Sequence, residues 1–337
     1  MTTAETTHYS IVIPCFNEEA SLANTVVDVL KVGRDAGWDF ELILINDGSR
    51  DATATQAYSL ASTNPEIRVI DLTRNFGQAQ AYQAGFDAAR GTVTILFSAD
   101  NETPAENIAT AAKAVDDGWD FVNTCRVNRW KGARAIQSKV ANAITNRISG
   151  LVIHDRGSGL KAMTTDIARR LRLYGEWHRF LPDLASIYTS RILEIPVEFR
   201  DRTAGVSAYA KRLRTLAVFL DLAGVAFCLR SRKKPFSMLP ARLFGFTGMV
   251  LALVGGGVAA YFVALKLAVG AVLSDRPLFM LAIMLLVLGA IMAMVGLLGE
   301  MAFRFAAESS GIRDYVLRPS SRAAHPRTPL APKAPSP

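Results

Sequence analysis

Two long uncharged stretches near the C-terminus constrain the architecture of this chain most strongly. Residues 243–265 and 277–299 each hold 23 residues without a charged side chain, and only a short segment connects them. A helix of about 20 apolar residues crosses the hydrocarbon core of a bilayer. We therefore predict a transmembrane helical hairpin within residues 236–303, in preference to two core helices of a soluble protein.

Lysine and arginine residues cluster on both outer sides of this hairpin. Before it stand Arg230, Arg232, Lys233, Lys234 and Arg242, and after it stand Arg304, Arg313, Arg318, Arg322, Arg327 and Lys333. The connecting segment carries only Lys266 and Arg276. The positive-inside rule then predicts an inner-membrane protein with both termini in the cytoplasm. We therefore interpret the formal charge of +8 as a sign of contact with a membrane surface. Membrane lipids are the expected partners, and nucleic acid is not.

The segments around the hairpin carry predictions of their own. We expect residues 212–235 to form an interfacial juxtamembrane helix with a basic linker. A helix expected at 136–153 fits either the membrane interface or the protein core. Residues 304–337 are interpreted as a basic cytoplasmic tail, disordered after about residue 319. The N-terminus lacks a signal-peptide pattern, so the first domain is expected to stay in the cytoplasm.

Residues 1–211 have the pattern of an α/β domain. Apolar runs of strand length occupy residues 10–15, 40–45, 67–72, 92–97 and 121–125, and helical patterns occupy 19–31, 51–62, 78–89 and 105–115. Continuous apolar strands separated by helices predict a mostly parallel sheet covered on both faces. Ligands of such sheets bind at the carboxyl ends of the strands. The residues that follow each strand are therefore the candidate site.

Four of these strand ends carry acidic or amide side chains. They are Pro14–Glu19, Asn46–Ser49, Arg74–Gly77 and Ser98–Glu102. A single such residue could cap the next helix, but four at one sheet edge indicate a binding site. No Gly-x-Gly-x-x-Gly follows the first strand, and no Gly-x4-Gly-Lys-Ser/Thr occurs. These absences argue against a dinucleotide-dependent dehydrogenase and against a P-loop enzyme.

These motifs resemble those of family 2 inverting glycosyltransferases, whose fold is the Rossmann-like, mostly parallel α/β fold called GT-A. The closer resemblance is to polyprenyl-phosphate glycosyltransferases similar to dolichyl-phosphate mannose synthase, of the bacterial type with a two-helix anchor. The motifs are Ile13–Glu18, Asn46–Ser49, Arg74–Gly77, Arg126, Arg134 with Ser138, Gly157–Lys161, Glu194–Val197 and Arg202–Tyr209. The resemblance implies transfer of a sugar from a UDP- or GDP-sugar to polyprenyl phosphate, for cell-envelope glycan synthesis or modification.

The resemblance also implies roles for individual residues. The nucleotide-sugar side would contain Pro14, Asn17, Glu18, Asp47, Gly48, Ser49, Asn75 and Gly77. Asp100 and Glu102 would hold Mg²⁺ or Mn²⁺ at the donor diphosphate. The catalytic set would comprise Asp100, Arg126, Arg134, Ser138 and Arg202. Of these, Arg126, Arg134 and Ser138 would receive phosphates, Arg134 and Ser138 that of the acceptor, and Arg202 would reach the donor diphosphate. Members of the family often form homo-oligomers.

This chain departs from the family pattern after the fourth strand. The family usually has Asp-Ala-Asp-Leu-Gln, whereas this chain has Ser98-Ala99-Asp100-Asn101-Glu102. The number of carboxylates is the same, but one has moved from the first position to the last. Two further departures are Phe199 and Ala208, which stand where the family usually has His and Lys. The sequence specifies neither the sugar nor the nucleotide.

The chemistry of the acceptor separates the alternatives. A phosphate monoester has a second pKa of about 6 and is already ionised, so it attacks the anomeric carbon without a general base. A hydroxyl acceptor needs a carboxylate base, for which Asp155 and Asp183 are the candidates. A membrane scaffold, a lipid translocator or a catalytically degenerate homologue would need neither arrangement.

Overall fold

The computed structural model describes residues 8–100, 102–127, 142–198, 224–226, 228–229, 240–270, 272 and 276–309. Contacts divide the chain after Leu229, so that a second compact unit runs from Arg230 to Arg313. The predicted limits of the domains, at residues 211, 235 and 303, stay predictions. The interfacial segment before the hairpin and the C-terminal tail lie almost wholly outside the described residues.

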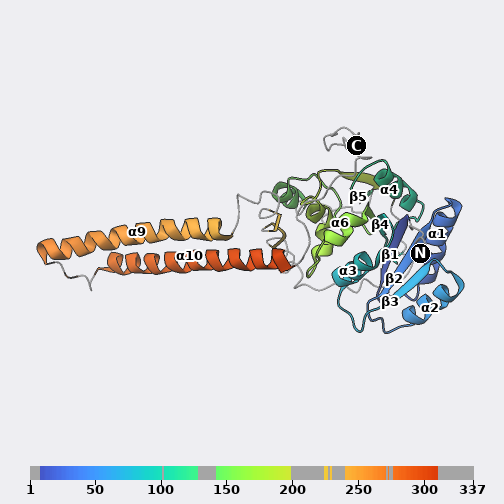
Figure 1. Cartoon of the computed structure of the whole chain (residues 1–337), viewed down its shortest axis with the longest axis horizontal. Coiled ribbons are helices and arrows are strands. Elements are labelled where there is room, and N and C mark those ends of the chain that lie inside the picture. Colours follow the sequence, from blue (N-terminus) through green and yellow to red (C-terminus); the bar gives the residue numbers. More distant parts are fainter. Residues whose placement is uncertain are drawn as a thin grey trace. The chain divides into compact units, whose positions relative to one another are not determined.

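A seven-stranded sheet forms the centre of the first unit (Figure 1), in the order β3-β2-β1-β4-β6-β5-β7. The strands are β1 (Tyr9–Cys15), β2 (Phe40–Asn46), β3 (Ile67–Asp71), β4 (Val93–Leu96), β5 (Phe121–Arg126), β6 (Lys161–Thr164) and β7 (Ile192–Val197). Among these strands, β6 runs antiparallel to both neighbours, β4 and β5, while the other neighbouring pairs are parallel. The mostly parallel sheet predicted from the sequence is confirmed.

Helices cover both faces of this sheet. One core cluster joins Ile11 and Ile13 of β1 to α1 (Leu22–Asp35), α2 (Thr53–Thr63) and α4 (Asn107–Asp116). The other joins Val12 to α3 (Gln78–Ala88), α6 (Thr165–Arg170) and α7 (Leu181–Ala185), which follows the short 3₁₀ helix η1 (Trp177–Phe180). Successive residues of a strand point to opposite faces. A strand buried on both faces is therefore apolar throughout, which is the pattern that marked these strands in the sequence.

The predicted alternation of strand and helix holds through β5. Helix α1 begins at Leu22 and α2 at Thr53, slightly later than predicted, because residues 16–21 and 47–52 form the loops of the site. Strands β6 and β7 were not predicted. In particular, β6 reaches its place between β4 and β5 from a distant part of the chain, a pairing that the local apolar pattern does not encode.

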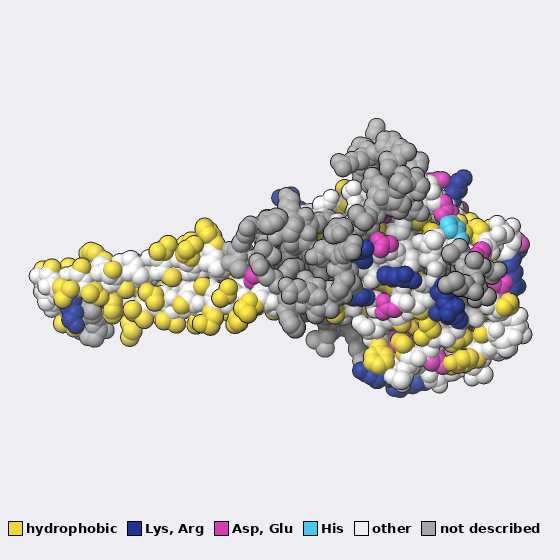
Figure 2. Space-filling model, viewed as in Figure 1, with side chains coloured by type: hydrophobic (Ala, Val, Ile, Leu, Met, Phe, Trp, Pro, Cys, Tyr) yellow, Lys and Arg dark blue, Asp and Glu magenta, His cyan; other side chains and the backbone are white. Residues whose placement is uncertain are grey.

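Two long apolar helices, α9 (Pro240–Val269) and α10 (Pro277–Ser309), form the hairpin of the second unit. Their candidate spans are Phe244–Val269 and Pro277–Ala302, and only 17% and 11% of an apolar 18-residue window within each span is buried. Core helices of a soluble protein would be mostly buried, whereas the outer surfaces here are covered by hydrophobic side chains (Figure 2). The predicted transmembrane hairpin is confirmed, and the chain is a membrane protein.

Small residues allow α9 and α10 to approach closely. A Cβ atom added at Gly289 would lie 2.5 Å from the carbonyl oxygen of Gly248, and one at Gly255 would lie 2.6 Å from the carbonyl oxygen of Ala282. Such backbone proximity is typical of helix pairs in membranes. Gly255 thus packs inside the hairpin. At Gly257 an added Cβ would meet nothing within 4 Å.

Candidate active site

The loops after β1 and β2 are joined by hydrogen bonds between their polar residues. Asn17 adopts a left-handed conformation, with φ of +56°, and its Oδ1 accepts the backbone N–H of Arg50 at 2.8 Å. Its own N–H donates to Oγ of Ser49 at 3.1 Å, and the N–H of Glu18 donates to Oγ1 of Thr53 at 2.9 Å. Asparagine tolerates positive φ better than most residues. These bonds shape one polar rim at the carboxyl edge of the sheet.

Asp47 joins the loop after β2 to the loop after β3. Its side chain is nearly buried, at 3% exposure of the residue, and its carboxylate accepts the backbone N–H groups of Phe76 at 2.7 Å and Gly77 at 2.9 Å. Burial raises the pKa of Asp47, while these two hydrogen bonds act in the opposite direction. Gly48, with φ of +65°, lies so close to the backbone of Arg74 that an added Cβ would stand 2.5 Å from its carbonyl carbon.

The structure brings the eight predicted donor-side residues together at this edge. Glu18 accepts a hydrogen bond from Oγ of Ser21 at 2.8 Å, Pro14 is half-buried, and Asn75 is exposed beside Phe76. The guanidinium of Arg74 stacks over the ring of Phe76 at 4.2 Å. The contact of Asp47 with the nucleotide sugar stays a prediction, and what the geometry shows is that its carboxylate shapes the Arg74–Gly77 loop.

The loop after β4 carries the two predicted metal ligands. The backbone N–H of Glu102 donates to Oδ1 of Asp100 at 3.3 Å, so the two residues share one tight turn. Ser98, which replaces an acidic residue of the family pattern, packs on Gly159, where an added Cβ would lie 1.9 Å from Oγ of Ser98. Continuing the β4–β6 register from Leu96 and Lys161 places Ser98 directly opposite Gly159. A glycine at 159 is therefore required by close approach of these two strand ends.

Arg126, at the end of β5, is held between two carboxylates. Its guanidinium donates to Asp155 through Nε at 2.6 Å and through Nη2 at 2.9 Å. Its Nη1 lies 3.6 Å from Glu102, and its side chain is 3% exposed. A bidentate pair of this kind fixes the direction of the planar guanidinium. The structure thus connects the predicted phosphate-binding arginine to the predicted metal-binding loop.

A second layer of polar residues supports Asp155. The carboxylate of Glu194 accepts the backbone N–H groups of His154 at 2.9 Å and Asp155 at 3.1 Å, and the side-chain amide of Asn123 at 2.9 Å. Lys161 lies buried beneath this loop and donates to the carbonyl oxygen of Ser158. Burial lowers the pKa of Lys161 to about 8. Lys161 and Glu194 belong to two sequence motifs, Gly157–Lys161 and Glu194–Val197, for which the sequence predicts no role. In the structure both residues support the loop that carries Asp155.

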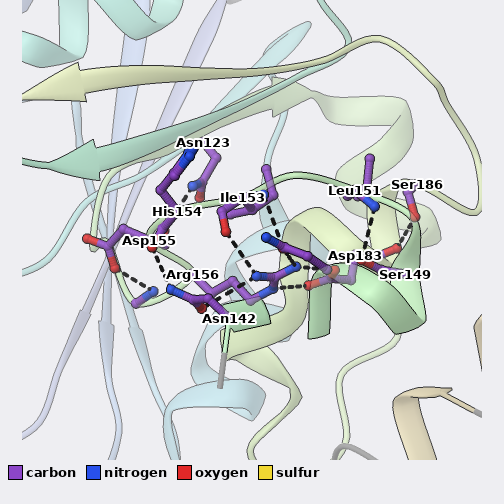
Figure 3. Close-up of polar contacts among 12 residues, drawn as sticks. Asn123, Asn142, Ser149, Leu151, Ile153, His154, Asp155, Arg156, Asp183 and Ser186 are labelled. Carbon is purple, nitrogen blue, oxygen red and sulfur yellow. Dashed lines mark hydrogen bonds and ion pairs between the residues drawn. The ribbon is translucent and has the colours of Figure 1, made fainter. Parts of the chain in front are cut away.

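Both carboxylates considered as general bases are paired with an arginine. Asp183 is completely buried, and Arg156 donates to its two oxygens at 2.7 and 2.9 Å (Figure 3). Asp155, whose side chain is 17% exposed, accepts hydrogen bonds from Nε and Nη2 of Arg126 and from the N–H of Gly157 at 3.0 Å. The Arg156–Asp183 pair was missed in the sequence, because nothing in local spacing links residues so far apart.

The described residues are compatible with a divalent cation at Asp100 and Glu102. No group of three or more His, Cys, Asp or Glu side chains converges as a metal site within the described ranges. Mg²⁺, however, is commonly bound by one or two carboxylates together with substrate phosphates. Two carboxylates on one turn, beside an arginine, match that donor set. The other predicted residues of the catalytic set, Arg134, Ser138 and Arg202, lie outside the described residues.

This sheet and its polar edge define the class of protein. Residues 10–172 match the model of glycosyl transferase family 2. The chain is 33% identical over 315 residues to the dodecaprenyl-phosphate galacturonate synthase of Rhizobium johnstonii, covering 92% of this chain and 91% of the relative. The chain belongs to glycosyl transferase family 2, and it is a glycosyltransferase.

Solved structures show the same fold. Glucosyl-3-phosphoglycerate synthase of Mycobacterium tuberculosis, in complex with Mn²⁺, UDP-glucose and phosphoglyceric acid, is similar with a TM-score of 0.50 and 19% identity, over 67% of this chain and 80% of that one. Its complex with Mn²⁺, UDP and phosphoglyceric acid gives the same TM-score and identity, over 68% and 79%. The predicted GT-A fold is confirmed.

Proposed function

We propose that the chain transfers a sugar, with inversion, from a nucleotide sugar to the phosphate of a polyprenyl phosphate at the cytoplasmic face of the membrane. The relative from Rhizobium johnstonii, similar along nearly the whole chain, is named for a product of this kind. Its name makes a nucleotide-activated galacturonic acid, with UDP or GDP as the nucleotide, the first donor to test. The product would serve cell-envelope glycan synthesis or modification.

The observation that carries this proposal is that Asp155 and Asp183, the two carboxylates considered as general bases, are each paired with an arginine. Asp183 is buried against Arg156, and Asp155 is held by Arg126. A hydroxyl acceptor would need one of them free as a base. A lipid phosphate is largely ionised at neutral pH and needs cations to receive it instead. We assign that task to Arg134 and Ser138, as the family resemblance implies, while Arg126, held between Asp155 and Glu102, adds a buried cation at the strand edge.

Asp100 and Glu102 are the residues we assign to a divalent cation. When bound, Mg²⁺ or Mn²⁺ would neutralise the charge that develops on the leaving nucleoside diphosphate. The rim formed by Asn17, Ser49 and the loop that Asp47 fixes would orient the nucleoside. Arg134, Ser138 and Arg202 complete the proposed set, with the roles that the family resemblance implies.

The hairpin gives the reaction its location. The count of Lys and Arg residues supports cytoplasmic termini, on the side where the donor-binding domain would meet nucleotide sugars. Since the acceptor stays in the bilayer, anchoring the catalytic domain raises its effective concentration at the lipid phosphate. Association between copies of the chain is compatible with this arrangement.

The test uses the purified full-length chain in lipid nanodiscs. Undecaprenyl phosphate is offered with a panel of UDP- and GDP-sugars and Mg²⁺ or Mn²⁺, and undecaprenol, which lacks the phosphate, is the matched control acceptor. We expect nucleotide release and a phosphate-linked lipid sugar only with the phosphorylated lipid. Transfer to undecaprenol at a similar rate would support the hydroxyl-acceptor alternative, and no release with any donor would refute the proposal.

The metal assignment has its own test. Asp100→Ala and Glu102→Gln should each weaken Mn²⁺ binding in the presence of UDP, measured directly by the Mn²⁺ electron paramagnetic resonance signal. Asp166→Asn, at an exposed site on α6, is the control. Unchanged Mn²⁺ binding by Asp100→Ala would overturn the assignment.

A further inference from the structure

Arg126 lies between two carboxylates and contacts them unequally. Its Nε and Nη2 donate to Asp155 at 2.6 and 2.9 Å, whereas its Nη1 lies 3.6 Å from Oε2 of Glu102. Because an N–H···O hydrogen bond joins atoms about 2.7 to 3.2 Å apart, the contact with Glu102 is an ion pair without a direct hydrogen bond. The guanidinium is therefore bound to Asp155 and stops short of Glu102.

Asp155 is itself fixed from the side of β5 and β7. Its carboxylate accepts the backbone N–H groups of Gly157 at 3.0 Å and of Arg126 at 3.3 Å. Its own N–H donates to Glu194 of β7 at 3.1 Å, and its carbonyl oxygen accepts a hydrogen bond from Nδ2 of Asn123 of β5 at 2.9 Å (Figure 3). These bonds hold the Asp155 carboxylate without any contribution from the loop after β4.

Glu102, on that loop, stands beside two cations in the proposed active site. One is the guanidinium of Arg126, and the other is the divalent cation that we assign to Asp100 and Glu102. An arginine that pairs with a carboxylate through two parallel N–H donors engages both of its oxygens, and those oxygens are the ligands that a hard cation requires. The two positive charges also repel each other more strongly as the distance between them falls. A full pair between Arg126 and Glu102 would therefore exclude the metal.

We propose that Asp155 is a positioning residue for the metal site, which acts by withholding Arg126 from Glu102. This inference rests on the proposed function, in which Asp100 and Glu102 hold the divalent cation. Asp155 binds the Nε and Nη2 edge of the guanidinium, while Glu102 lies near Nη1. Asp155 thus acts through Arg126 and not by contact with the metal. Without the negative charge of Asp155, the guanidinium turns to Glu102 and competes with the metal for that carboxylate.

The experiment measures the Kd of Mn²⁺ for the full-length chain in phosphatidylcholine nanodiscs, by electron paramagnetic resonance, with UDP at one saturating concentration and empty nanodiscs subtracted. Asp155→Asn removes the charge, Arg126→Met removes the guanidinium, and a third protein carries both substitutions. The control is Glu41→Gln, which breaks an ion pair of 2.6 Å with Arg68 at the amino end of β2, the opposite edge of the sheet. The melting temperature is recorded for every variant.

We expect Asp155→Asn to raise the Kd of Mn²⁺ about tenfold, because the guanidinium then moves closer to Glu102. In the Arg126→Met background the same substitution should change the Kd by less than about twofold, since no guanidinium is left to withhold. Glu41→Gln should lower the melting temperature and leave the Kd unchanged. A purely structural Asp155 would give a lower melting temperature with an unchanged Kd, or an equal loss of Mn²⁺ binding with and without Arg126. Either result would overturn the inference.

Arg126→Met decides alone if Asp155→Asn fails to fold. The Kd of Mn²⁺ in Arg126→Met should lie at or below that of the parent, whereas a rise of about tenfold would show that Arg126 supports the metal site, and would overturn the inference. Unchanged Mn²⁺ binding by Asp100→Ala refutes the metal assignment of the proposed function and this inference with it. If Asp100→Ala does weaken Mn²⁺ binding, an unchanged Kd in Asp155→Asn refutes the positioning role alone.

Discussion

The replacement of Gly48 by Ala tests whether the loops after β2 and β3 share the close contact described above. Gly48 has φ of +65°, and an added Cβ would lie 2.5 Å from the carbonyl carbon of Arg74 and 2.6 Å from the nitrogen of Asn75. The left-handed conformation costs an L-residue about 1 to 2 kcal/mol, and overpacking against backbone adds about 1 to 3 kcal/mol. We therefore expect Gly48→Ala to lower the free energy of unfolding by about 3 kcal/mol.

A matched control separates the two contributions. Gly37 has nearly the same φ, +63°, but an added Cβ would meet nothing within 4 Å, so Gly37→Ala should show the conformational cost alone. Unfolding is followed by urea titration of circular dichroism, and donor-site integrity by UDP affinity. Gly48→Ala should weaken UDP binding about tenfold, since the clash displaces the loop that Asp47 fixes, and Gly37→Ala should leave it unchanged. Equal stability losses in the two variants, with equal UDP affinity, would refute the contact between these loops.

Three further predictions follow from the same structure. Asp155→Asn leaves the buried Arg126 without its bidentate charged partner, with only the more distant Glu102 remaining, and should lower stability by about 3 kcal/mol while reducing kcat only partly; a complete loss of kcat with unchanged melting would instead identify Asp155 as the base. Burial lowers the pKa of Lys161 to about 8, so Lys161 binds a proton more weakly in the folded than in the unfolded chain. The stability of the parent relative to Lys161→Met should therefore rise between about pH 8 and pH 10. An equal difference in melting temperature between the parent and Lys161→Met at about pH 7 and at about pH 10 would contradict this. Gly289→Leu should separate the hairpin helices and lower the melting temperature in nanodiscs, with Gly257→Leu, which faces open space, as the control expected to have little effect.

Much of the fold could be predicted because its signals are local. Mostly apolar strands such as 40–45 need burial on both faces, and a stretch such as 277–299 has no charged group that water would have to hydrate. The strand ends with Asn17, Asp47 and Asp100 followed from the rule that parallel strands present their carboxyl ends at one edge. Strand β6 escaped prediction because a short antiparallel strand inserted between distant partners leaves no periodic signature.

The roles of paired charges needed the coordinates. Asp155 and Asp183 look alike in the sequence, as two acidic residues able to serve as a base. Their partners, Arg126 and Arg156, are 29 and 27 residues away, a separation at which spacing carries no information about contact. In the structure each of them is paired with an arginine, the half-buried Asp155 with Arg126 and the buried Asp183 with Arg156.

The sequence by itself determined the class of molecule, an α/β domain with a polar strand edge joined to two apolar spans. The reason is that the hydrophobic pattern and the length of a segment depend only on residues that are neighbours in the chain. Only the tertiary structure decided that Ser98 rests on Gly159 and that Asp47 holds the loop at Phe76 and Gly77. It also decided that Arg126 points from Asp155 toward Glu102. The reason is that an ion pair or a close backbone approach depends on where distant segments meet, and that meeting is set by the packing of the whole sheet.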